Sequence, residues 1–190
     1  DRGSTSNCGA VYVAVGFEGE LGALGTGTSL DTGDIGSRFR GTRSAELVGI
    51  SRADGDLDGD GATDVFVGGL RSRASGGTPY GGVFVFDGGG AWWTDPGRIP
   101  NKADEAAYSD TANSELGSAL SADGDLDGDG LVDLLVGAPA GAGYAVLLTS
   151  TTYTANGAAD SSNALRQDAV FAGSASCLLY TSDAADETCR

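Results

Sequence analysis

The sequence predicts an all-β protein built from repeated units of short strands, and three observations support this. Gly supplies 33 of the 190 residues, which favours tight turns between short strands over long helices. A ten-residue acidic segment occurs twice with nearly the same sequence. Each copy leads directly into a short apolar run of the kind that forms a buried strand.

The acidic segment is the core of a longer internal repeat. It is GDLDGDGATD at residues 55–64 and GDLDGDGLVD at residues 124–133, with eight of the ten positions identical. The offset is 69 residues, and the same offset aligns Leu47 with Leu116 upstream. A match of this length indicates two copies of one structural unit.

Short apolar runs place the predicted strands. In each copy one run follows the acidic segment and a second comes after a Gly-rich gap. These runs lie at residues 64–67 and 83–86 in the first copy and at 133–136 and 144–148 in the second. Residues 9–13 resemble the second strand of each unit, so we expect them to end a preceding unit. We expect residues 169–173 to begin a following one.

The strands and repeats divide the chain. The expected parts are the end of a preceding unit with a linker at 1–35, a full unit at 36–100, a second full unit at 101–150, and the start of a following unit at 151–176.

The charge of the chain restricts its partners. The formal net charge is −16, from 27 acidic and 11 basic residues, so phosphate backbones and anionic lipid surfaces are repelled. No apolar stretch is long enough to span a bilayer, and we expect neither nucleic acid binding nor direct membrane insertion. Because the acidic residues concentrate in the two repeated segments, metal binding is the expected use of the charge.

The spacing of the aspartates predicts two calcium sites. Alternate Asp residues with Gly between them let several carboxylates converge, and an all-oxygen shell suits Ca²⁺. Without a metal, such close carboxylates would repel one another. The predicted ligands are the carboxylates of Asp56, Asp58, Asp60 and Asp64 with the Ala62 carbonyl in the first loop, and those of Asp125, Asp127, Asp129 and Asp133 with the Leu131 carbonyl in the second. We expect this calcium to be structural.

An EF-hand does not fit these loops. The EF-hand requires a bidentate Glu at loop position 12 and a helix on each side. Val67 and Val136 occupy that position here, inside apolar strands. Ordinary Asp-Gly turns are the simplest alternative, but two nearly identical ten-residue loops favour metal binding. We therefore predict metal loops on hairpins between strands.

The second copy resembles the FG-GAP repeat, a blade of the β-propellers found in integrin α-subunits and in many bacterial and secreted proteins. Leu116-Gly117 stands where the family has Phe-Gly, residues 125–133 form the calcium loop, and Gly137-Ala138-Pro139 is the GAP sequence. The first copy keeps the calcium loop but departs at both flanking motifs, with Leu47-Val48 and Gly68-Gly69-Leu70.

The resemblance implies a partial β-propeller of about two FG-GAP blades with flanking strands of neighbouring blades. Propellers of this type close with about seven blades of four strands, so two repeats cannot close one. The remaining blades of a parent chain are then expected partners.

Composition and resemblance together favour a binding module over an enzyme. The sequence contains no His, which removes Ser-His-Asp and Cys-His catalysis. Asp31-Thr32-Gly33 is similar to an aspartic-protease triplet, but a turn is favoured because that chemistry needs two such loops.

The resemblance implies an extracellular or cell-surface scaffold. We expect it to serve adhesion by binding protein or carbohydrate through loops opposite the metal hairpins. The alternative is a non-catalytic propeller module of a larger secreted hydrolase or phospholipase.

The C-terminal residues 177–190 are expected to lie outside the biological fold. The segment CLLYTSDAADE at 177–187 resembles the translation of an adaptor used in preparing sequencing libraries. With an opening at Asp1 rather than Met, this predicts a fragment of a longer protein.

Overall fold

The computed structural model describes most of the two predicted repeats and parts of their surroundings. The described residues are 7–13, 37–42, 44–72, 80–90, 97–98, 103, 105–109, 111–149 and 169–173. Asp31-Thr32-Gly33 and the tail at 177–190 lie outside these ranges.

Within the described ranges the chain forms β-strands and no helix, so the predicted all-β class is confirmed. Membrane-spanning helices are accordingly absent from this part of the chain. The strands are β1 (Ala10–Val13), β2 (Ser37–Arg40), β3 (Val48–Gly55), β4 (Asp64–Gly69), β5 (Gly82–Phe86), β6 (Gly97–Arg98), β7 (Glu105–Tyr108), β8 (Ala119–Gly124), β9 (Asp133–Ala138), β10 (Tyr144–Leu148) and β11 (Ala169–Ala172).

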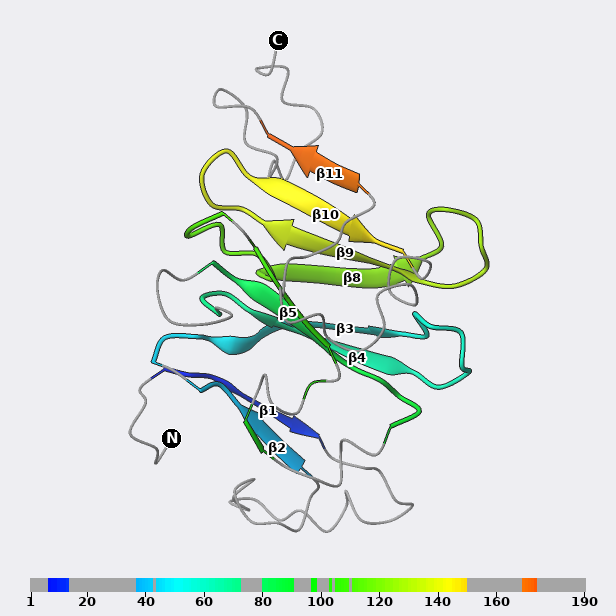
Figure 1. The fold of residues 1–190 in the computed structure, drawn as a ribbon, viewed down its shortest axis with the longest axis horizontal. Coiled ribbons are helices and arrows are strands. Elements are labelled where there is room, and N and C mark those ends of the chain that lie inside the picture. The colour runs from blue at the N-terminus through cyan, green and yellow to red at the C-terminus, as the bar shows by residue number, and fades with distance from the viewer. Residues whose placement is uncertain are drawn as a thin grey trace, which may run out of the picture.

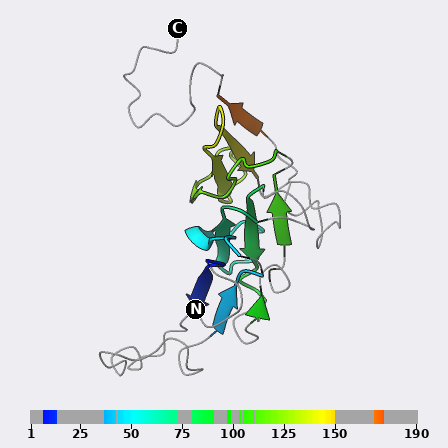
Figure 2. The same ribbon diagram turned by 90° about the vertical axis from the view of Figure 1, so that its left-hand side faces the viewer.

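Three sheets lie one above another, as Figures 1 and 2 show. The middle sheet has the order β3-β4-β5-β7 and the upper sheet the order β8-β9-β10-β11, and both are antiparallel throughout. In the lower sheet β1 pairs antiparallel with β2, and β2 pairs parallel with β6. Two four-stranded meanders stacked face to face correspond to two blades of a partial propeller.

The strand pairing groups the strands into units that differ from those predicted from the sequence. The segment at 169–172, expected to begin a following unit, pairs with β10 as the fourth strand of the second blade. Similarly, β7 completes the first blade, and β2 pairs with β1 rather than with β3. The strand β7, with the sequence EAAY, lacks the apolar run that marks the inner strands, so the sequence pattern did not identify it. The strand β11 has such a run, AVFA, but the sequence pattern does not show which sheet it joins.

The lower sheet contains the outer half of a third blade. The same backbone bond closes one hairpin in each sheet: the amide just after β2, β7 and β11 donates to the carbonyl just before β1, β5 and β10, respectively. These bonds run from Gly41 to Gly9, from Ser109 to Gly81 and from Gly173 to Gly143, at 3.2, 3.1 and 2.8 Å. The β1–β2 hairpin is therefore equivalent to β5–β7 and β10–β11.

The structure corrects the alignment of the two copies ahead of their acidic loops. Val48 and Leu116 are both buried, and each is followed by a Gly with φ of +87° or +86°. Val48-Gly49, and not Leu47-Val48, therefore stands at the Phe-Gly position. Leu116 follows Val48 by 68 residues, so the second copy has one residue more before its loop. The β3–β4 and β8–β9 ladders absorb the difference by shifting register at different places.

The first blade is buried on both faces. Alternate side chains of β5 point to opposite sides of the sheet. Phe84 and Phe86 join a cluster with Phe39 of the half blade, whereas Val83 and Val85 join a cluster with strands of the second blade. Phe39, Phe66, Phe84 and Phe86 are among the largest buried side chains of these two clusters.

Close backbone contact joins the first and second blades. A Cβ at Gly68 would overlap the carbonyl oxygen of Gly117 and the hydroxyl of Ser51. The Ser51 hydroxyl donates a hydrogen bond of 2.5 Å to the same Gly117 oxygen. The first copy has Gly68-Gly69-Leu70 in place of Gly-Ala-Pro, but it keeps the first glycine. This glycine is the residue of the motif that the contact requires.

The blade contact predicts different costs for one substitution at two equivalent positions. We expect Gly68→Ala to lower the free energy of unfolding by about 1–3 kcal/mol, because the new methyl overlaps fixed backbone. Gly137 occupies the same position in the second blade, where the nearest atom to an added Cβ is the Ala119 Cβ at 3.4 Å. Gly137→Ala should change stability by no more than about 0.5 kcal/mol. Urea unfolding measures both, and equal losses would contradict the contact.

Candidate metal centre

The two acidic loops occupy equivalent places in adjacent blades. Residues 56–63 connect β3 to β4, and residues 125–132 connect β8 to β9, both on the right-hand side of Figure 1. The Leu131 side chain of the second loop lies against Gly59 of the first, where an added Cβ would meet its Cδ1 at 3.1 Å. The second loop therefore packs against the first.

Backbone amides shape the first loop around its aspartates. The Asp56 carboxylate accepts hydrogen bonds from the amides of Gly59 and Gly61, at 2.8 and 3.1 Å. Asp58 accepts from the Asp60 amide at 3.0 Å. Gly59 and Gly61 have φ of +79° and +87°, a conformation that Gly adopts without steric cost. The alternating Asp-Gly sequence therefore encodes the curl of the loop.

The second loop repeats this arrangement. Asp125 accepts from the amides of Gly128 and Gly130 at 2.6 and 2.8 Å, and Asp127 accepts from the Asp129 amide at 3.1 Å. The same bonds at the same spacing show that the repeated sequence encodes a repeated local structure.

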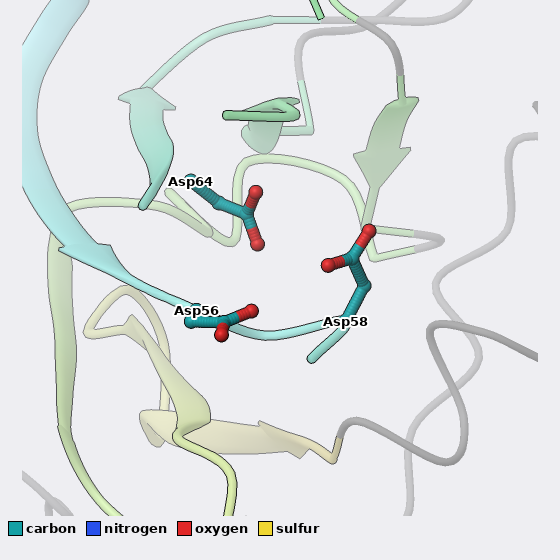
Figure 3. A group of neighbouring side chains, drawn as sticks. All are labelled: Asp56, Asp58 and Asp64. Carbon is teal, nitrogen blue, oxygen red and sulfur yellow. The ribbon is translucent and has the colours of Figure 1, made fainter. Parts of the chain in front are cut away.

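The structure gathers three of the predicted carboxylates in each loop. Figure 3 shows the Asp56, Asp58 and Asp64 carboxylates turned toward a common space. In this group, one ligand atom from each residue lies within 4.8 Å of those of the others. The second loop forms the matching group of Asp125, Asp127 and Asp133 within the same limit.

The fifth and seventh loop positions contribute differently. Asp60 groups with Asp58 and Asp87 instead, and Asp129 lies outside the group of its own loop. The amides of Ala62 and Leu131 donate to Asp60 and Asp129 at 2.7 and 2.9 Å. Ligation by the carbonyls of Ala62 and Leu131 remains a prediction.

The sequence analysis did not include Asp87. This residue directly follows β5, and its carboxylate comes within reach of the first loop because the β5–β7 connection passes beside it. Thr149 holds the equivalent place after β10. A comparison of the residues that follow the second apolar run in each copy would have marked the difference, but only the sheet pairing brings Asp87 to the loop.

Asp64 and Asp133 are the last aspartates of the two loops, and we call them the closing aspartates. Both are deeply buried. Asp64 is fully buried, and both its oxygens accept amide hydrogen bonds of 2.9 Å, Oδ2 from Leu57 and Oδ1 from Gly88. Asp133 is 2% exposed, and its Oδ2 accepts from Leu126 and Asp127. Its Oδ1 is buried with no hydrogen-bond partner in the part of the chain that the structure describes.

The second loop therefore fits a bound cation. A buried carboxylate oxygen without a partner is costly. Here the carboxylate belongs to a group with two further carboxylates, and a cation placed among them would satisfy it. The donor set of the group consists of oxygens alone, which suits a hard cation.

Burial and neighbouring charge both disfavour ionisation in the first loop. Burial raises the pKa of Asp64, with a smaller rise from the charges of Asp58 and Asp87, while the amide bonds from Gly88 and Leu57 oppose the rise. Partial burial likewise raises the pKa of Asp58, and the surrounding carboxylates add to this. A cation would offset both causes.

Strand order and acidic hairpins together define the class of this protein as a set of β-propeller blades whose acidic loops could hold a cation. Residues 116–148 match the family model of the FG-GAP repeat, so the second blade is an FG-GAP repeat, as the resemblance predicted. No curated protein matches the chain. The matched region runs from the buried Leu116 through the second acidic loop to the end of β10.

The raised pKa values predict how metal-free stability depends on pH. A carboxyl with a raised folded pKa contributes stability that is fully present below its unfolded pKa, near 3.8 for Asp64, and that is lost as the pH rises through the folded value. We expect the metal-free protein to have a higher thermal midpoint near pH 4 than near pH 7, and Asp64→Asn to reduce this slope.

Calcium should reverse the trend, because bound metal requires deprotonated carboxylates. Thermal melts between pH 4 and pH 7, with and without calcium, measure both slopes. A metal-free midpoint that rises with pH over this range would contradict the predicted loop electrostatics.

Proposed function

We propose that each acidic loop binds one structural Ca²⁺ ion. The observation that supports this most directly is the unpartnered, buried Oδ1 of Asp133 beside the carboxylates of Asp125 and Asp127. Folding gathers three negative charges in each loop, and without a cation they repel one another. Calcium accepts six to eight oxygen ligands in flexible geometry, which suits carboxylates at alternate positions of a loop.

The proposed role of calcium is to brace the hairpin between the first two strands of each blade. Asp64 and Asp133 are the first residues of β4 and β9, so an ion held by the loop also fixes the start of the following strand. Leu57, inside the first loop, is 1% exposed and belongs to the core between the blades. Closure of the loop is thus coupled to packing of the core.

We infer that another blade of a parent polypeptide covers the free face of the second blade. Leu126 is 63% exposed, whereas the equivalent Leu57, which the second blade covers, is 1% exposed. A hollow of about 410 Å³ on this face is lined by residues that include Ala119, Gly137 and Tyr144. In the first blade, the region around Gly68 receives the backbone of Gly117. We propose that the turn of a further repeat that is equivalent to the turn at Gly117 occupies this hollow.

We propose that the module belongs to an extracellular or cell-surface protein and serves as a non-catalytic scaffold for a protein or carbohydrate ligand. Calcium loops of extracellular modules bind at about 10⁻⁴–10⁻³ M, which suits the millimolar calcium outside cells. Among the described residues, each group of three neighbouring carboxylates lies in or beside one of the two loops, and the proposed metal occupies these carboxylates, which leaves them unavailable for acid–base catalysis.

Calcium titration of two single variants tests the proposal. We expect calorimetry on the native chain to show two sites, and Asp58→Asn and Asp127→Asn each to remove the site in its own loop. At ten times Kd, each site should add about 1.4 kcal/mol, which is roughly 3–6 °C in the thermal midpoint of a chain of this size.

Asp54→Asn is the matched control, because Asp54 is an exposed acid outside the loops and its loss changes the net charge equally. The control should retain both sites. An unchanged midpoint of the native chain on adding millimolar calcium would refute the structural role.

A further inference from the structure

We propose that the two loops differ in their dependence on calcium. The second loop stays closed only with the ion bound, whereas the first stays closed without it. This inference rests on the proposed function, since it concerns how the two calcium sites are regulated. It follows from the unequal hydrogen bonding of two closing aspartates that the sequence repeat makes equivalent.

In the first loop, protein groups alone satisfy the closing carboxylate. Asp64 accepts one amide bond from Leu57, inside the loop, and another from Gly88, in the connection after β5. The Gly88 bond joins the loop to a separate part of the same sheet. Removing a cation leaves both Asp64 oxygens paired, so the loop retains the bonds that close it.

In the second loop, the corresponding carboxylate is only half satisfied. The amides of Leu126 and Asp127 both donate to Oδ2 of Asp133, and no group in the described residues donates to Oδ1. The bond that Gly88 provides to Asp64 thus has no counterpart at Asp133 among the described residues. Without an ion, a buried oxygen beside two other carboxylates remains uncompensated, and opening of the loop into water relieves it.

The surroundings of the loops favour the same difference. Leu131 of the second loop covers Gly59 of the first, whereas an added Cβ at the equivalent Gly128 would meet nothing within 4 Å. Asp56 and Asp58 are half-buried, but Asp125 and Asp127 are exposed. The second loop therefore has less packing to hold it closed.

Amide hydrogen exchange of the full chain, with calcium and then with a calcium chelator, tests the inference. The amides that donate to the two closing carboxylates report directly on loop closure. On chelation we expect exchange at Leu126 and Asp127 to accelerate about ten-fold or more, and exchange at Leu57 and Gly88 to change by less than about three-fold.

The outcomes separate this inference from the proposed function. Equal acceleration in both loops, or a larger one at Leu57 and Gly88, would overturn the inference while leaving two calcium sites in place. No response to chelation anywhere, together with no calcium binding in calorimetry, would overturn the proposed function itself.

Two matched variants provide a second test in metal-free buffer. Asp133→Asn keeps an oxygen for the Leu126 and Asp127 amides and turns an NH₂ donor toward the neighbouring carboxylates. It should raise the metal-free thermal midpoint by about 2–4 °C. Asp64→Asn instead places an NH₂ group against an amide donor, from either Leu57 or Gly88. It should lower the midpoint by about 2–4 °C or more, with or without calcium. A lower metal-free midpoint for Asp133→Asn would contradict the inference.

Discussion

Face-to-face stacking of the sheets is the constraint on which the rest of the structure depends. The first blade lies between the half blade and the second blade, so β4 and β5 bury side chains on both faces. Such stacking brings backbone against backbone at Gly68 and Gly117, where no side chain fits. It also explains why the inner strands are continuous apolar runs, since neither of their faces meets water.

Stacking also sets the surroundings of the acidic loops. Because equivalent hairpins of successive blades lie side by side, the second loop covers the first through Leu131 on Gly59. Leu57 is buried by its neighbouring blade, whereas Leu126 is exposed on the outer face of the stack. Two loops with nearly the same sequence therefore have different environments. The unequal hydrogen bonding of Asp64 and Asp133 adds to this difference.

Much of the fold and of the candidate site could be predicted from the sequence. The apolar runs at β4, β5, β9 and β10 were identified because strands buried on both faces are continuously apolar. The outer strand β7 was not identified, because its sequence EAAY carries little apolar patterning. The apolar run AVFA of β11 was identified as a strand but assigned to a following unit, because its pairing with β10 depends on the tertiary structure. The Phe-Gly position of the first copy was misaligned by one residue, since the β-ladder absorbs the difference with a register shift. Asp87 was missed because the β5–β7 connection brings it to the loop.

The sequence by itself determined the local structure of the acidic loops. Their hydrogen bonds join residues two to seven positions apart, from Asp58 with Asp60 to Leu57 with Asp64, so the Asp-Gly spacing suffices to encode them. Only the tertiary structure decided what distinguishes the two loops. Gly88 reaches Asp64 across 24 positions of the chain, and Leu131 reaches Gly59 from another blade. Contacts of that separation depend on strand pairing and blade stacking, which no local pattern specifies.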